Sequence, residues 1–239
     1  MLTEAGEGIL ARVEEMASAA AQIVLGQGEG LGLSGTLRIG VPEGFGTWFL
    51  APLLPEFAGL HRQLTVELVA NSSYLSLSKR EADVAIFLSR PQAGALIAQR
   101  LTDYALSLYA SPAYLDRRGI PTEPADLADE HTLAGYIPDL LYAPELRYLD
   151  EIHGGLSAHL RSSSINAQHR LLVAGGGIGV LPCFIGNAES GLVRVLPEVT
   201  IRRSFWLVTH KDTQQLSKVR RFNEWLRKII GSSRHQLLP

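Results

Sequence analysis

Two hydrophobic patterns alternate along most of the chain. From residue 36, short apolar runs typical of buried strands are separated by segments with the 3.6-residue periodicity of helices. Strands are predicted at residues 36–41, 64–70, 82–88, 96–101 and 105–110, with a helix at 47–60. Because this alternation is typical of parallel sheets covered by helices, the sequence predicts an α/β fold.

A second unit of the same style is predicted at residues 111–207. Ser111 ahead of Pro112 is a favourable helix start. Strands are predicted near 131–135, 157–161, 178–181 and 192–195, and the main helix at 165–174. The strand at 205–210 and an amphipathic helix at 216–230 are expected to complete the first unit, with crossing strands near 109–111 and 207–210 joining the two.

The first 25 residues carry a narrower apolar stripe. Its members follow a 4-3-4-3 spacing and are Leu2, Gly6, Ile9, Val13, Met16, Ala20 and Ile23. This is the seam of a coiled coil or the buried face of a helix lying on its own domain, and we favour the seam. The glycine-rich segment 26–35 is predicted to be a structureless hinge.

Nine short segments, in this order, resemble the effector-binding region of LysR-type transcriptional regulators. They are GTLRIG, FLAPLLPEF, ADVAI, LYASPAYLDRRG, ADLADEHTLAG, VAGGGIGVLP, GLVRVLPE, WLVTHKD and VRRFNEWLRKII. Each motif is weak alone, but together they cover about residues 35–230. The resemblance implies two Rossmann-like lobes with a ligand cleft between them, the type II arrangement of periplasmic binding proteins, preceded by an N-terminal helix.

The resemblance also implies the domain organisation. Residues 1–30 would form a linker or dimerisation helix and hinge, residues 35–110 plus 208–231 lobe I, and residues 111–207 lobe II. In that family a winged helix-turn-helix domain precedes the linker helix, and here it is absent. Either the chain is trimmed, which we favour, or the natural protein is a stand-alone sensor. DNA would be contacted only through that missing domain, and a homodimer or homotetramer is expected.

Composition supports a small-molecule partner. The net charge of −2 over 239 residues gives no general attraction to phosphate. The single cysteine, Cys183, cannot form a disulfide within the chain, which favours a reducing compartment. Glutamates precede the apolar segment 16–26 where a signal peptide would be basic, and no apolar run is long enough to span a bilayer. We therefore expect a cytoplasmic protein without membrane contact.

Candidate ligand-binding residues lie in strand-to-helix turns, where unpaired N–H groups of helix starts gather at one edge of a sheet. The effector-binding candidates are Glu43, Gly44, Phe45 and Thr47 in the first turn, Asn71 and Ser72 in the second, Ser162, Ser163, Ser164 and Asn166 in the third, and Tyr136 and Phe184 as apolar walls. Each set also has a structural interpretation, as helix caps or as core. The resemblance favours the first turn, which lines the effector cleft in the family.

The charge of the ligand stays open at this point. The three serines of the third turn, beside the exposed N–H groups of a helix start, suit an anionic or strongly polar group. An unpaired carboxylate of Glu43 in the cleft would repel an anion, unless the adjacent helix start satisfies it.

Catalytic and metal sites are not predicted. The GGGIG segment at 175–179 matches neither a phosphate loop nor a dinucleotide fingerprint, and it is expected to end a helix and pack closely. His153 and His159 share no helix face, and Cys183 in an apolar run is typical of an inert buried thiol. No cofactor is expected. The alternatives to a ligand-sensing regulator are a periplasmic solute-binding protein, which a secretion signal would favour, and an enzyme on the same scaffold.

Overall fold

The computed structural model describes residues 33–70, 81–91 and 95–238, together with Ile9, Arg12, Val13 and Met16. These last four residues are helical, and the three seam positions among them are more than half exposed. Several predictions lie outside the described residues: the seam positions Leu2, Gly6, Ala20 and Ile23, hinge residues 26–32, and the candidates Asn71 and Ser72.

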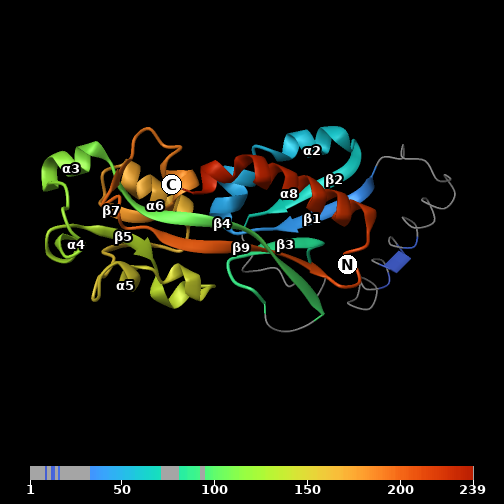
Figure 1. Ribbon diagram of the computed structural model, residues 1–239, viewed down its shortest axis with the longest axis horizontal. Helices are drawn as coiled ribbons and strands as arrows, with labels where there is room; N and C mark the ends of the chain where they lie inside the picture. Colours follow the sequence, from blue (N-terminus) through green and yellow to red (C-terminus); the bar gives the residue numbers. More distant parts are fainter. Residues whose placement is uncertain are drawn as a thin grey trace.

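Two groups of three parallel strands form the ends of one mixed sheet (Figure 1). In the first group β1 (Ser34–Gly40) lies between β2 (Gln63–Val69) and β3 (Val84–Phe87). In the second, β5 (Leu133–Tyr136) lies between β6 (Leu160–Ser162) and β7 (Ile178–Pro182). The predicted α/β fold is confirmed, with a parallel arrangement inside each group.

Two long antiparallel strands, β4 (Leu96–Ala110) and β9 (Ile201–His210), join the groups. β4 pairs with β9 from Leu96 to Leu106, and its last residues pair with β7 and with β8 (Val193–Val195). The prediction of two separate strands at 96–101 and 105–110 is therefore wrong. The polar Thr102 and Asp103 suggested a break, but the structure absorbs it as a register shift between Arg100 and Thr102.

The helices cover this sheet. They are η1 (Phe45–Leu50), α2 (Leu54–Leu60), α3 (Pro112–Arg118), α4 (Asp126–Asp129), η4 (Pro138–Leu140), η5 (Pro144–Leu146), α5 (Leu149–Ile152), α6 (Ile165–Val173), α7 (Cys183–Gly186) and α8 (Ser217–Leu237). None of the helices described has the length and apolar character needed to cross a membrane.

Two helix predictions need correction. The helix expected at 47–60 is two helices, because η1 is a π-helical turn in which Ala51 N–H bonds Gly46 O, and Pro52 has no N–H with which to continue it. The last helix continues seven residues past residue 230, to Leu237, whose side chain is fully buried. The Ser111 cap is confirmed, since its Oγ accepts a hydrogen bond from Tyr114 N–H at 3.3 Å.

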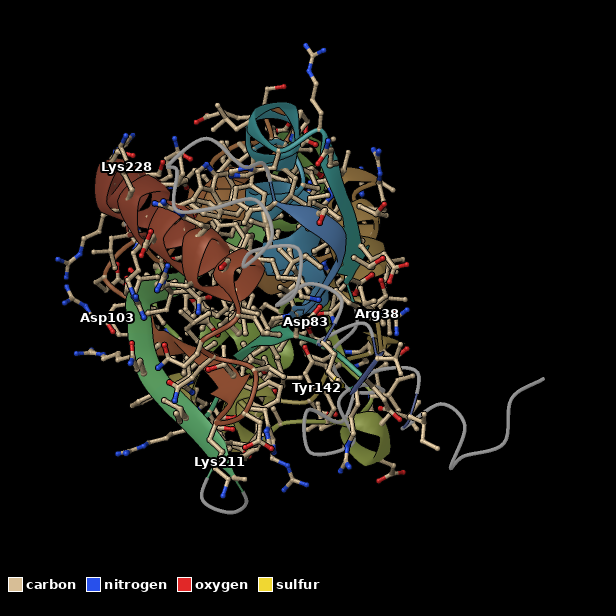
Figure 2. The ribbon with its side chains drawn as sticks, turned by 90° about the vertical axis from the view of Figure 1, so that its right-hand side faces the viewer. Arg38, Asp83, Asp103, Tyr142, Lys211 and Lys228 are labelled. Carbon is tan, nitrogen blue, oxygen red and sulfur yellow. The ribbon has the colours of Figure 1, made fainter. Side chains whose placement is uncertain are left out.

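One large hydrophobic cluster runs through both ends of the molecule, and a second, smaller one contains Ala82, Ala85 and Val208. α8 buries Val219, Phe222 and Leu226 on one face, as the periodicity predicts. At its start, Lys218 Nζ lies 3.0 Å from Asp83 Oδ1, and Asp83 Oδ2 accepts a hydrogen bond from Arg38 N–H at 2.9 Å (Figure 2). The GGGIG segment follows α6 and runs into β7. A Cβ on Gly177 would lie 2.3 Å from Thr132 O, so the predicted role of this segment in close packing is confirmed.

Candidate functional site

The turn after β1 reaches across the molecule to the start of α6. The carboxylate of Glu43 accepts hydrogen bonds from Ser164 Oγ at 2.8 Å and Asn166 Nδ2 at 3.0 Å through Oε1, and from Ile165 N–H at 3.0 Å through Oε2. The neighbouring Gly44 permits this approach, because a Cβ there would lie 3.0 Å from Ile185 and 3.2 Å from Ile165. Glu43 therefore ties two segments more than 120 residues apart.

Glu43 occupies the place in which a helix binds an anion. The first N–H groups of α6 are free of partners within the helix and carry partial positive charge. One of them, on Ile165, donates to the carboxylate, and Ser164 both caps the helix and donates to Glu43. The structure thus meets the condition stated from the sequence: the helix start satisfies Glu43.

Asn166 makes the contact more specific. Its Oδ1 accepts a hydrogen bond from Trp48 Nε1 at 2.7 Å, and its Nδ2 lies 3.3 Å from Thr47 Oγ1 in addition to its bond with Glu43. The Trp48 ring also meets the buried His169 ring edge-on at 4.7 Å. Trp48 was not predicted from the sequence, where a single tryptophan on a helix is ordinarily read as core.

The three serines of the third turn play different roles. Ser164 Oγ accepts from Ala167 N–H at 3.1 Å, while Ser162 Oγ accepts from Ser164 N–H at 3.1 Å. Ser163 is exposed. The hydroxyls of Ser162 and Ser164 are therefore engaged within the protein, rather than converging on an open point.

Beside this contact lies a small, half-open cavity of about 40 Å³. Four tyrosines line it: Tyr104, Tyr136, Tyr142 and Tyr148. Three phenylalanines complete its aromatic lining: Phe45, Phe184 and Phe205. This volume is well below the roughly 150 Å³ of an engineered cavity that binds benzene. It is too small for an organic ligand unless its walls move.

Sequence reasoning found part of this lining. Phe45, Tyr136 and Phe184 were candidates, and Gly44 also borders the cavity. Tyr104 was missed because it follows the polar pair that we took for a gap between strands. Tyr142 and Tyr148 lie in an irregular segment with short helices, where neither hydrophobic period applies.

Burial raises the pKa of every tyrosine in the lining, that of Tyr142 to about 12. For Tyr136, neighbouring tyrosines and then the negative charge of Glu43 raise the pKa further. Tyr148 donates from its hydroxyl to Gln168 Oε1 at 3.3 Å, and Gln168 Nε2 bonds Ser162 O. All four phenols are therefore protonated at neutral pH.

His169 is a second titratable group at the contact. Burial lowers its pKa, and the carboxylate of Glu189, 3.2 Å from Nε2, offsets part of this effect. His169 is therefore neutral at pH 7. Over the described ranges, no group of three or more His, Cys, Asp or Glu side chains is placed to hold a metal ion.

Comparison with known proteins assigns this architecture to a family. Residues 30–230 match the model of the LysR substrate binding domain. An HTH-type transcriptional regulator of Haemophilus influenzae is 32% identical over 216 residues, which are 83% of this chain and 70% of that relative.

Solved structures agree. The regulatory domain of CrgA, a LysR-type transcriptional regulator from Neisseria meningitidis, superposes with a TM-score of 0.73 at 25% identity, over 82% of this chain and 98% of that one. The effector domain of AmpR from Pseudomonas aeruginosa gives a TM-score of 0.68 over 85% of this chain and 100% of its own. At 20% identity, that second likeness bears on the fold alone.

Changing Glu43 to alanine is expected to lower the free energy of unfolding by about 1 to 3 kcal/mol, because it leaves the donors of Ser164, Ile165 and Asn166 without their acceptor. Urea denaturation at pH 7 measures this. Glu198→Ala, at an exposed position, is the matched control and should change stability by less than about 0.5 kcal/mol. Equal effects of the two variants would contradict the role given to Glu43.

Acidification is expected to destabilise the fold through His169. Its folded pKa lies below the ordinary value of 6.5, so the unfolded chain takes up this proton first. The free energy of unfolding that neutral His169 contributes is fully present above about pH 6.5, and it is lost as the pH falls toward the pKa of His169 in the folded protein. His61 and His131, whose pKa values burial also lowers, add to the same trend.

The measurement is the urea midpoint at pH 7, 6 and 5 for the wild type and His169→Gln. The variant should lose less stability on acidification than the wild type, whereas His153→Gln, at an exposed position, should follow the wild type. A steeper loss in His169→Gln would show that His169 does not resist protonation in the folded state.

Proposed function

Because the chain belongs to the LysR-type transcriptional regulators and contains their substrate-binding domain, we propose that it senses a small molecule in the tyrosine-lined cavity and regulates transcription through the arrangement of its two halves. The observation that carries this proposal is the position of the cavity. Its lining joins the turn after β1, the crossing strands β4 and β9, and the start of α6.

The proposed lobes follow from the sheet. Lobe I comprises residues 35–110 plus 208–231 and lobe II residues 111–207, with residues 1–30 as linker and hinge. The two parallel groups of strands, joined only through β4 and β9 in the sheet order, support this division. The lobes would change their relative angle about these two connecting strands, with a rearrangement of the part of the hydrophobic core that both lobes share.

The effector site is proposed to include Glu43, Gly44, Phe45, Thr47, Tyr136, Ser162, Ser163, Ser164, Asn166 and Phe184. The contacts of Glu43 and Asn166 across the cleft, and the positions of Phe45, Tyr136 and Phe184 in the cavity lining, support this set. Asn71 and Ser72, outside the described residues, stay a sequence-based hypothesis.

A mechanism follows from the size of the cavity. An organic ligand needs more than about 40 Å³, so it binds an arrangement in which the lobes or the loop carrying Tyr142 have moved. A ligand shifts an equilibrium only by its difference in affinity for the two arrangements. The Glu43 contact stabilises the closed arrangement, and a ligand that moves the loop carrying Tyr142 can enter while this contact persists.

Membership in the LysR family is the basis for our proposals on location, oligomeric state and DNA binding. The chain would act in the cytoplasm as a homodimer or homotetramer. DNA would be reached only through a winged helix-turn-helix domain, a proposal that the names of the HTH-type relatives support as far as the helix-turn-helix. We propose no catalytic activity: the polar groups at the cleft bond one another and are not arranged as a nucleophile with its base.

The test is thermal melting with a panel of uncharged aromatics, carboxylates, amines and sugars. A ligand at about 100 times its Kd should add about 2.7 kcal/mol of stability. Leu146→Phe, which fills the cavity lining, should abolish the shift, and Leu140→Phe, in the same loop but 59% exposed and outside the lining, should keep it. A panel without any shift, or a shift unaffected by Leu146→Phe, would reject the cavity as the sensing site.

A further inference from the structure

We propose that the effector is an uncharged, ring-containing molecule with one hydroxyl-type group, and that the cavity rejects carboxylates. This inference rests on the proposed function, since it names the class of ligand for the same cavity. It stands on three features: an uncharged aromatic lining, an anion position already filled by Glu43, and phenol groups without partners.

The lining carries no charge. None of the described residues that border the cavity is Lys, Arg, His, Asp or Glu. A carboxylate moved from water into such a site loses its hydration and gains no counter-charge, which is among the most costly transfers a ligand can make. The charge of Glu43 raises the pKa of Tyr136 and Tyr142, which disfavours an anion beside them. At Tyr104 the positive charge of Arg203 acts in the opposite direction, but Arg203 is already paired with Glu151.

The group that could compensate an anion is already in use. The start of α6 is the anion-binding feature of this cleft, and Glu43 fills it with three hydrogen bonds. A ligand carboxylate would have to displace a tethered carboxylate of the same chemistry. A neutral ligand can enter while this contact persists.

The aromatic lining favours a ring. Tyr104 stacks on Phe205 with centroids 4.1 Å apart and planes at 13°, and Phe205 lies 4.6 Å from Phe45. The ring centroid of Phe184 lies 6.4 Å from the centroids of both Tyr104 and Phe205. A ligand ring inserted beside this cluster gains the edge-to-face and offset contacts that aromatic groups prefer.

The tyrosine hydroxyls of the lining favour a ligand whose ring carries a polar group. The Tyr148 hydroxyl is engaged by Gln168, whereas those of Tyr104, Tyr136 and Tyr142 have no hydrogen-bond partner among the described residues. A protonated phenol both donates and accepts, which matches a hydroxyl on the ligand. An ammonium group is also charged and would lose its hydration in this site, while the carboxylate of Glu43, which could compensate it, is outside the lining and already accepts three hydrogen bonds, so an amine is less well matched.

The experiment compares three probes with one ring and different charges: benzyl alcohol, benzoate and benzylamine. Their Kd values are measured with the full chain by calorimetry and thermal shift at pH 7. Benzyl alcohol is expected to bind at least about tenfold more tightly than benzoate or benzylamine. Tighter binding of benzoate or benzylamine to the wild type would overturn the proposed class.

Variants separate recognition from folding. Tyr136→Phe should weaken the binding of benzyl alcohol about fivefold relative to the binding of toluene, because only the alcohol loses a hydrogen bond. Tyr148→Phe, whose hydroxyl is engaged by Gln168, should leave the ratio of alcohol to toluene affinity unchanged. The same ratio in the wild type and Tyr136→Phe would contradict hydroxyl recognition by Tyr136.

The Glu43→Ala variant tests whether Glu43 excludes anions from the site. It frees the start of α6, so it should increase benzoate affinity at least about tenfold and change that for benzyl alcohol by less than about threefold. If no probe and no member of the wider panel binds, the proposed function fails together with this class. If an anion or an amine binds best and Leu146→Phe blocks it, the sensing site stands and only the inference about ligand class fails.

Discussion

The structure depends on a carboxylate placed at the start of a helix on the other side of a cleft. Glu43 bonds Ser164, Ile165 and Asn166, and Asn166 in turn holds Trp48 and Thr47. The partial positive charge of α6 would otherwise face a half-open cleft with its donors unpaired. One side chain therefore satisfies the helix start and joins the two halves, and in our proposal it also occupies the position that an anionic ligand would need.

The rest of the fold connects this contact to the proposed movement of the two halves. Two parallel groups of strands, each with its own helices, are linked in the sheet by β4 and β9 alone. The stack of Tyr104 on Phe205 lies on these crossing strands and forms the floor of the cavity. A ligand that widens the cavity thus acts on the strands about which the halves would turn, which connects binding to arrangement by direct packing.

Sequence reasoning reached the fold class, because strand periods and strand-to-helix turns are local signals. It also named Glu43 as a candidate whose carboxylate left the charge of the ligand open, but not whether α6 would satisfy that carboxylate. That answer, like the bond between Trp48 and Asn166, depends on segments 118 residues apart. Tyr104 was not identified from the sequence because Thr102 and Asp103 interrupt the hydrophobic pattern of the strand, although the strand continues through a register shift. The π-helical turn η1 was not predicted because the hydrophobic periodicity of residues 47–60 is that of one continuous helix and does not show that the helix is interrupted at Pro52.

The most direct test measures the distance between the two halves. Spin labels on Glu56→Cys in α2 and Asp129→Cys in α4 are both at exposed positions, while the native Cys183 is fully buried. The account predicts one narrow distance distribution for the labelled chain and a shifted or broader one when Glu43 is also changed to alanine. Identical distributions with and without Glu43 would show that this carboxylate does not hold the halves together.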